Sequence, residues 1–187
     1  MLKFAFKEWA VICEALALGK QSILLRKGGI AEDFAVEETR FWLYPTFVHQ
    51  QNNGIQDDAK SLLEQVLANR PPAGKVGLQL WAENIRAYQI RDELPAMMLS
   101  HLHHWSDETV RKRFNYRHPG LFVLVVRVHG MPNPIDIDVR PEYEGCRSWV
   151  TLDRELPTKG SAPVIDDASF RVLQRQLDLL LAATAYC

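Results

Sequence analysis

The chain has 187 residues, a formal net charge of -1, and 47% hydrophobic against 24% charged residues. This length and composition predict one soluble globular domain, residues 1–187, which needs no disulfide or metal for its stability. A nearly neutral chain lacks the overall positive charge of a basic nucleic-acid-binding protein, so any such function has to rest on a local patch.

The cysteine count indicates the cellular compartment. Three cysteines without a C-x-x-C pair argue for a reducing environment and against a disulfide framework or structural zinc, so we expect a cytoplasmic protein. The apolar N-terminus is interrupted by lysine and glutamate, which argues against a signal peptide. No apolar run approaches the ~20 residues of a membrane span, and we expect no membrane association.

The first 30 residues predict a helix, a strand and a turn. Apolar residues recur at helical spacing at Ala5, Trp9, Ile12 and Leu16, which favours a helix over a strand. Gly19 is placed to end this helix in a left-handed cap. The following "QSILLRKGG" predicts a short buried strand and a turn.

Residues 40–50 are rich in aromatic and β-branched side chains and predict a second strand, bent or at an edge at Pro45. This strand could form a hairpin with the first. After a polar loop, Asp57 or Asp58 could cap a helix that carries leucines at 62, 63 and 67.

The middle of the chain predicts both strands and helices. Residues 75–90 alternate, with a change of phase near Glu83 that indicates either a bulge or a hairpin. A short helix is expected from Leu94 to His103, followed by another capped by Ser106 or Asp107. The nearly continuous apolar run "LFVLVVRVH" predicts a central strand, which "GMPNP" should end.

A last short strand, "RSWVTL", precedes a helix that begins near Asp167 and buries an apolar stripe. Strands and helices are mixed without a regular βαβα rhythm. The prediction is an α+β fold with a curved or partly closed mixed sheet flanked by helices.

The sequence "RKGG" is the sharpest local feature. Consecutive glycines let backbone N–H groups approach an anion while the two cations neutralise it, so Arg26, Lys27, Gly28 and Gly29 form a candidate phosphate site. The alternative is a hairpin turn with solvated cations. No P-loop or dinucleotide motif accompanies it.

A second basic patch interleaves cations with Phe114 and Tyr116, a combination that single-stranded nucleic acid can use. Its cations are Arg111, Lys112, Arg113 and Arg117. The alternative is a solvated helix face whose aromatic residues point into the core.

Metal chemistry finds little support in the sequence. His101 and His104 lie at helical i, i+3 spacing, but zinc would need more ligands, and we interpret them as partly buried or capping histidines. Asp58 and Lys60 have the D-x-K form of a restriction-type nuclease, although they fall at a helix start. We expect no metal site and no cofactor.

Five segments together resemble the bacterial family known as domain of unknown function 1802. They are "KEWA" (7–10), "LGKQSILLRKGGI" (18–30), "FWLYPTFVHQ" (41–50), "RFNYR" (113–117) and "PEYEGCRSWVTL" (141–152). The family has no established activity. Some relatives are joined to restriction-endonuclease-like domains, so the resemblance implies nucleic-acid metabolism or defence.

The helix–glycine–strand segment is also similar, more weakly, to ASCH and PUA-like barrels, whose members often bind RNA or modified bases. Their signature is G-x-K-x-x-E-x-R. Gly19 and Arg26 match it, whereas Gln21 and Leu24 replace its lysine and glutamate. A PUA-like barrel is therefore one form that the curved sheet could take, without the catalytic role of the signature.

These observations lead to one main hypothesis and two alternatives. The main one is a module that binds RNA, single-stranded DNA or a modified base, with Arg26, Lys27 and the glycine amides on phosphate. Arg147 is a second phosphate contact, and the residues expected to stack on or hydrogen-bond a base are Tyr44, His49 and Trp149. The alternatives are a divalent-metal nuclease or phosphoester hydrolase and a structural or regulatory partner of another protein; the oligomeric state is left open.

Overall fold

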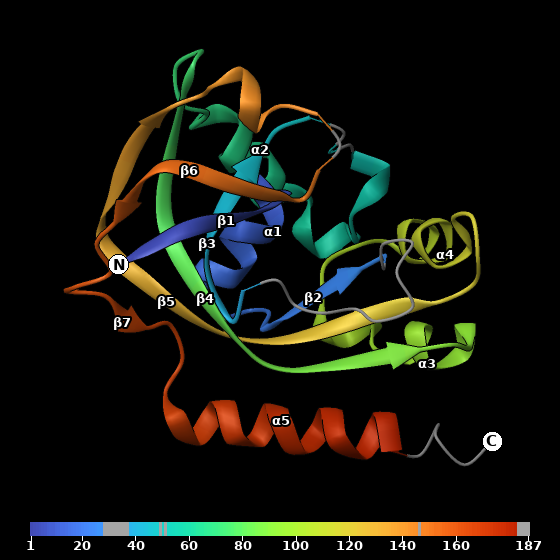
Figure 1. The fold of residues 1–187 in the computed structure, drawn as a ribbon. Helices are drawn as coiled ribbons and strands as arrows, with labels where there is room; N and C mark the ends of the chain where they lie inside the picture. The colour runs from blue at the N-terminus through green and yellow to red at the C-terminus, as the bar shows by residue number, and fades with distance from the viewer. Residues whose placement is uncertain (28–37, 49, 51, 146, 183–187) are drawn as a thin grey trace.

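The computed structural model describes residues 1–27, 38–48, 50, 52–145 and 147–182. In these ranges one mixed sheet is surrounded by helices (Figure 1). The strands are β1 (Leu2–Trp9), β2 (Ile23–Arg26), β3 (Arg40–Thr46), β4 (Lys75–Ile90), β5 (Leu121–Asp138), β6 (Trp149–Leu156) and β7 (Ala162–Pro163). The α-helices are α1 (Ala10–Ala17), α2 (Lys60–Ala68), α3 (Glu93–Met98), α4 (Asp107–Asn115) and α5 (Asp167–Ala182), with short 3-10 helices η1 (Asn52–Gly54), η2 (Asp57–Ala59), η3 (Ser100–Leu102) and η4 (Pro141–Tyr143).

The strand order is β2-β5-β4-β3-β1-β6, with β7 added to β5. The β1–β3 pair is parallel and the other pairs are antiparallel. The sheet curls but does not close, because β2 and β6 are not paired with each other in the described chain (Figure 1). The predicted α+β class with a partly closed, helix-flanked sheet is confirmed.

The opening segment corrects one prediction. Residues 2–9 form strand β1, and the helix begins only at Ala10. Ala5 and Phe6 are both buried although they face opposite sides of the sheet, so the centre of β1 is apolar throughout and imitates a helical stripe. The end of the helix was predicted correctly, since Gly19 has a φ of +66°.

The predicted hairpin between the segments that form β2 and β3 is also wrong. Strand β2 pairs with β5, and β3 lies between β1 and β4. Neighbouring segments in the sequence are thus separated in the sheet, because each finds an apolar partner strand elsewhere.

The long β4–β5 pair forms the centre of the sheet and runs from Lys75 opposite Asp138 to Ile90 opposite Leu121. Of the two interpretations of residues 75–90, the bulge is correct, with a register shift between Asn84 and Arg86. "GMPNP" does not end the strand as predicted, because its prolines fall where the ladder shifts between Leu78 and Leu80, and proline is tolerated at such an irregularity.

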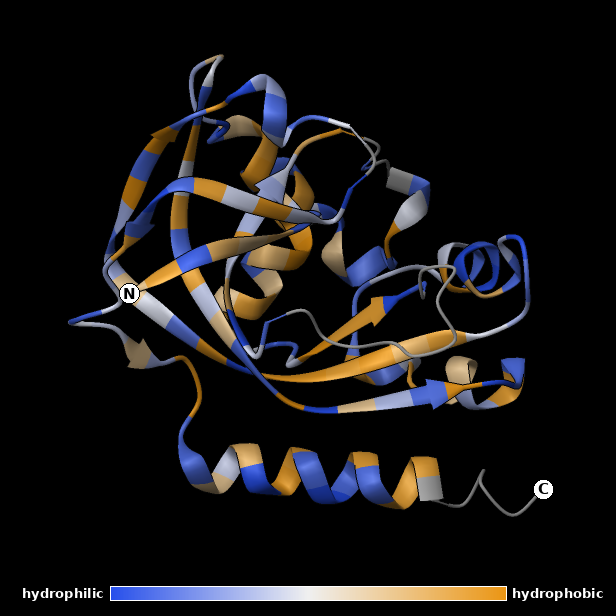
Figure 2. Ribbon diagram, viewed as in Figure 1, coloured by the Kyte–Doolittle hydropathy of each residue, from blue (hydrophilic) through white to orange (hydrophobic). Residues whose placement is uncertain are grey.

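Both faces of the sheet are covered by apolar packing. Along β3, Phe41 and Leu43 join the larger core beneath the helices, whereas Trp42 and Tyr44 join a second core inside the curl. Figure 2 shows hydrophobic colour at the start of β5, where the consecutive residues Val123, Leu124, Val125 and Val126 are all buried. Strands buried on both faces lose the alternation that distinguishes strand from helix.

Two of the predicted helix starts are confirmed. Ser106 Oγ accepts the N–H of Thr109 at the start of α4, and α5 begins at Asp167.

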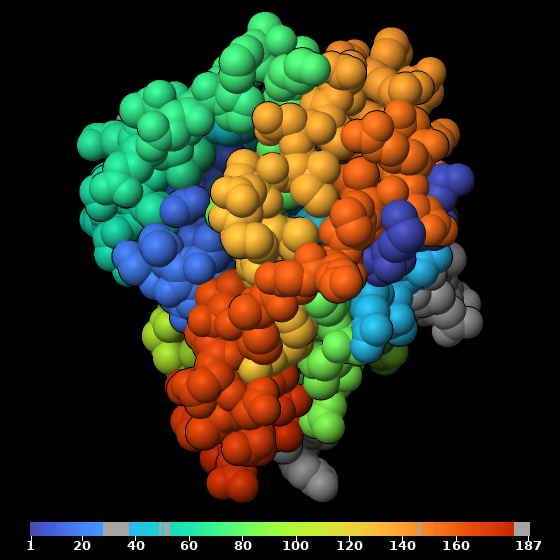
Figure 3. Space-filling view, turned by 90° about the vertical axis from the view of Figure 1, so that its left-hand side faces the viewer, coloured from blue at the N-terminus to red at the C-terminus, as the bar shows by residue number. Residues whose placement is uncertain are grey.

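Figure 3 shows the C-terminal segment lying against β5 and β4. It is fastened by an ion pair of 2.6 Å between Arg127 Nη2 and Asp167 Oδ1, with the same guanidinium 4.8 Å from the ring centre of Phe170. Among the described residues, none of the helices has the length and apolar character of a membrane span.

Candidate binding cleft

A large cleft opens where several strands end. The parallel strands β1 and β3 place their carboxyl ends at the same edge, and the end of β2, the segment before β4 and the segment between η4 and β6 complete the walls. The cleft has a volume of about 810 Å³, within the range of ligand-binding pockets.

The charge of this cleft differs from that of the chain. Seven lysine and arginine residues line it against two glutamates, although the whole chain has 22 basic and 23 acidic residues. The cations are Lys7, Arg26, Lys27, Arg70, Lys75, Arg113 and Arg147. The near-neutral sequence therefore folds into a protein with one strongly basic hollow.

Of the predicted site residues, Arg26, Lys27, Tyr44 and Arg147 line this cleft, as does Arg113 of the second patch. They come from four separate segments of the chain and are brought together only by the fold. Gly28, Gly29 and His49 lie outside the described residues.

Trp149 has a different environment. Its ring packs edge-on against Phe6 and Phe41, with centroid distances of 5.1 and 5.0 Å. It is not among the residues lining the cleft, so its surroundings are those of a core residue.

Lys27 is engaged at the end of a helix. Its Nζ donates to the carbonyl oxygens of Phe114 and Gly120, both at 2.9 Å, and to that of His118. Three carbonyls match the three N–H groups of an ammonium, and a cation is favourable at the C-terminal end of a helix dipole. Lys27 thus ties the end of β2 to the end of α4.

Arg113 forms the floor of the cleft. Its guanidinium lies between the rings of Trp9 and Trp105, at 5.1 and 4.9 Å from their centres, and Nη1 donates to the carbonyl of Leu25 at 3.1 Å. Nη2 is 3.8 Å from Oε1 of Glu8. The planar cation is therefore held rigidly between two aromatic rings.

Glu8 is the buried acid of the cleft, with 6% of its surface exposed. Burial raises the pKa of this carboxyl, and Arg113, the Trp9 N–H and Arg26 oppose that rise. The Trp9 N–H donates to Oε1 at 2.7 Å. Glu8 therefore places one acidic group next to Arg113 at the floor of the cleft.

Two arginines on the walls stack on aromatic rings. Arg26 lies 4.7 Å from the ring centre of Phe6, and Arg70 lies 5.0 Å from that of Phe47. Arg147 is exposed and makes no hydrogen bond or ion pair within the described residues. The cleft thus combines fixed cations with aromatic surface.

Sequence reasoning did not single out Lys7, Arg70 or Lys75 as site residues. Arg70 lies in "RPPAG", which carries only the signal of a helix end. Lys75 faces the cleft but is paired with Asp138 at 2.5 Å. No local pattern distinguishes these cations from solvated ones, because their position depends on strands distant in the sequence.

The second predicted basic patch is dispersed by the fold. Arg111 pairs with Glu93 at 3.1 Å, and Lys112 pairs with Glu108 at 2.6 Å. Arg117 is exposed and lies 5.2 Å from the ring centre of Tyr116. Only Arg113 of this group reaches the cleft.

The residues considered for metal binding are also separated. Lys60 pairs with Asp57 at 2.6 Å, and Asp58 lies 3.5 Å from His104 Nδ1. His101 contacts Gln176 at 2.9 Å. Within the described parts of the chain, no group of three histidine, cysteine or acidic residues could hold a metal ion.

The positions of the weaker signature lie below the surface. Gln21 is buried and donates to the carbonyl of Ile23 at 2.8 Å, while its Oε1 accepts the N–H of His104. Leu24 belongs to the core. Arg26 is the signature position that lines the cleft.

The described chain is thus an α+β domain with a basic cleft at the ends of its strands. Residues 5–176 match the family model described as Domain of unknown function (DUF1802), and the chain belongs to this family. The predicted family resemblance is confirmed. A search of curated proteins found no match.

Among solved structures, the chain resembles ASCH from Zymomonas mobilis with 14% identity and a TM-score of 0.49, covering 81% of this chain and 87% of that one. A single-residue variant of the same ASCH protein matches with 12% identity and a TM-score of 0.44, covering 92% and 94%. A second variant matches with 12% identity and a TM-score of 0.45, covering 81% and 90%.

Proposed function

We propose that the cleft binds single-stranded nucleic acid, with its cations on the phosphates and its aromatic walls beside the bases. The observation that carries this proposal is the charge of the lining, seven cations against two carboxylates in a chain of net charge -1. A local concentration of cations of this size favours a polyanion, because each phosphate that it neutralises releases counterions.

The geometry favours a single strand over an isolated phosphate. Arg70, Arg26 and Arg147 belong to different walls, so their charges are distributed along the hollow rather than converging on one point. The partly exposed ring of Phe47, already stacked on Arg70, offers a flat surface to a base. Cationic grooves with such aromatic surfaces are typical of proteins that bind single strands.

Lys27 contributes indirectly to this function. Its ammonium is occupied by the carbonyls at the end of α4, the helix that carries Arg113. We therefore assign phosphate contact to Arg26, Arg70 and Arg147, and to Lys27 the positioning of the floor.

The test is fluorescence anisotropy with labelled single-stranded RNA, single-stranded DNA and duplex DNA over a series of salt concentrations. Arg147→Gln and Arg70→Gln should each weaken single-strand binding and lower the slope of log affinity against log salt by about 0.7 for each phosphate that the variant no longer neutralises. Arg171→Gln is the matched control, since Arg171 is an exposed cation on α5 that does not line the cleft.

Binding that is unchanged in both cleft variants would remove this site. Binding that Arg171→Gln weakens as much as they do would indicate non-specific attraction. Gel analysis of the same probes after incubation with Mg²⁺ tests the alternative of a metal-dependent nuclease.

A further inference from the structure

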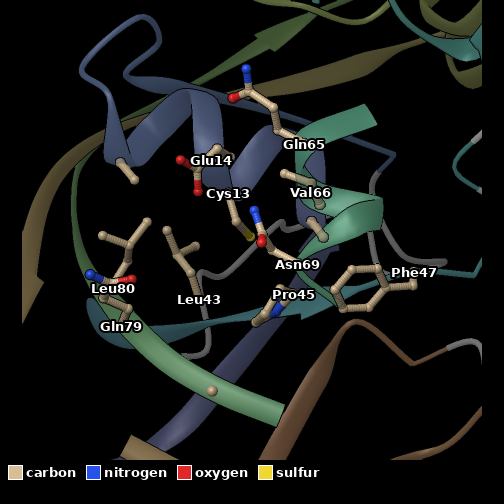
Figure 4. Close-up of a pocket in the computed structure, with 13 residues that line it drawn as sticks. Cys13, Glu14, Leu43, Pro45, Phe47, Gln65, Val66, Asn69, Gln79 and Leu80 are labelled. Atoms are coloured by element: carbon tan, nitrogen blue, oxygen red, sulfur yellow. The ribbon is translucent and has the colours of Figure 1, made fainter. Parts of the chain in front are cut away.

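A second cavity lies behind the cleft, between α1 and α2 on one side and β3 and β4 on the other (Figure 4). Its volume is about 210 Å³, below the ~300 Å³ at which pockets for drug-sized ligands begin. A cavity of this size suits a single ring system rather than a stretch of polymer.

The walls of this cavity are apolar where they are deepest. Leu43 and Leu80 come from the sheet, and Cys13 faces them from α1 (Figure 4). Burial raises the pKa of the Cys13 thiol well above its usual value, and Sγ points at the carbonyl of Glu8. Cys13 is therefore an unreactive part of the wall.

Hydrogen-bonding groups surround this apolar centre. Asn69 and Gln79 lie on opposite sides of Leu43 in Figure 4, and Glu14 lies next to Cys13 on α1. No lysine or arginine is among the described residues that line the cavity, in contrast to the cleft. Amides and one carboxylate between apolar walls suit an uncharged heterocycle and would repel a phosphate.

The cavity and the cleft adjoin each other. Pro45 and Phe47, at the end of β3 and just beyond it, line both. Arg70, which stacks on Phe47, lines the cleft and not the cavity. A strand with a phosphate near Arg70 would thus have one base next to the entrance of the cavity.

We infer that the cavity receives one base of the strand bound in the cleft and prefers a base that carries an exocyclic amino group. This inference rests on the proposed function of the cleft. Asparagine and glutamine amides match the edges of bases, and a carboxylate accepts a hydrogen bond from an amino group such as that of cytosine. Glu14 therefore selects cytosine or adenine against uracil.

The experiment uses fluorescein-labelled RNA strands of one length, oligo-C, oligo-A, oligo-U and an abasic strand, at fixed salt. We expect oligo-C and oligo-A to bind about tenfold more tightly than the abasic strand, the smaller end of the effect of one base contact, with oligo-U between them. Ala17→Phe, which places a ring on the cavity wall, should remove the preference for oligo-C and oligo-A over oligo-U.

Leu18→Phe is the matched control, because Leu18 is the neighbouring residue, is exposed and does not line the cavity. Asn69→Leu keeps the branched shape of the side chain and removes its amide, and it serves as the second variant if Ala17→Phe fails to fold. Glu14→Gln should reduce the difference in affinity between oligo-C and oligo-U.

The outcomes separate the two proposals. If the wild-type protein binds all four RNA strands with equal and salt-sensitive affinity, the base site is overturned and the cleft remains. The same conclusion follows if the preference for oligo-C and oligo-A survives in both Ala17→Phe and Asn69→Leu. If no strand binds, the proposed function fails. Saturation-transfer NMR with free cytidine then measures whether the cavity binds a nucleoside without the rest of a strand. A signal that Ala17→Phe abolishes would support a base site, and no signal would overturn it.

Discussion

His103 should make the protein sensitive to acid in a range where exposed histidines have little effect on stability. The ring is 2% exposed, and neither nitrogen has a hydrogen-bond partner within the described residues. It lies against Trp105 with a centroid distance of 5.5 Å. Burial and, in the same direction, the electrostatic effect of the neighbouring His104 and Arg113 lower the pKa of His103 from 6.5 to about 4.

The direction of the effect follows from this lowered pKa. Above pH 6.5, His103 is neutral in both the folded and the unfolded chain and does not affect the pH dependence. Between pH 6.5 and about 4 the unfolded chain binds a proton that the folded chain does not, so the free energy of unfolding falls as the pH falls. A difference of about 2.5 pH units at 1.36 kcal/mol each gives a loss of about 3 kcal/mol by pH 4, and about 2 kcal/mol by pH 5.

Urea unfolding at several pH values between 8 and 4 measures this loss in the wild type and in His103→Phe, which keeps a ring without a titrating group. The wild type should lose about 3 kcal/mol more than the variant over this range, since the other titrating groups are common to both and cancel in the difference. His118→Phe, at an exposed position, should follow the wild type. Parallel curves for the wild type and His103→Phe would refute the reasoning.

Two further predictions concern stability. Lys27→Met should lower the free energy of unfolding by about 1–3 kcal/mol, because the carbonyls at the end of α4 lose a charged donor. Urea unfolding measures this loss, with Lys20→Met at an exposed position as the control, and equal losses in the two variants would contradict the role assigned to Lys27. Gly19→Ala should cost more than Gly160→Ala, because both have positive φ but a Cβ at Gly19 would lie 2.7 Å from Ile165 Cγ2 and one at Gly160 would meet nothing within 4 Å. Thermal unfolding compares the two, and equal melting temperatures would show that the clash is relieved without cost.

The features that could be predicted from the sequence are those that local chemistry determines. Gly19 ends a helix because it tolerates positive φ, and Ser106 begins one because its hydroxyl accepts a backbone N–H. The apolar stripe of α5 was also readable, since that helix is buried on one side only. Strand β1 could not be recognised, because burial on both faces erases its alternation.

The cleft was predictable only in part. Arg26 was found because it stands beside two glycines, a local signal, whereas Arg70 lies in a helix end with no such signal. The role of Lys27 could not be inferred, because it depends on carbonyls about 90 residues further along the chain. Trp149 has the residue type of a stacking platform, but its neighbours in the fold place it in the core.

The pairing of β2 with β5 has a consequence for how the protein is made. Ile23 of β2 lies opposite Val125, so the partner of this strand, whose first three residues are buried, is synthesised about 100 residues later. At about 5–20 residues per second, the segment waits on the order of 5–20 s on the ribosome with its apolar side chains and backbone groups unpaired. The sheet is complete only after β6 and β7, at residues 149–156 and 162–163, have been synthesised as well, so β2 is among the first parts of the sheet to be made and among those that wait longest for a partner.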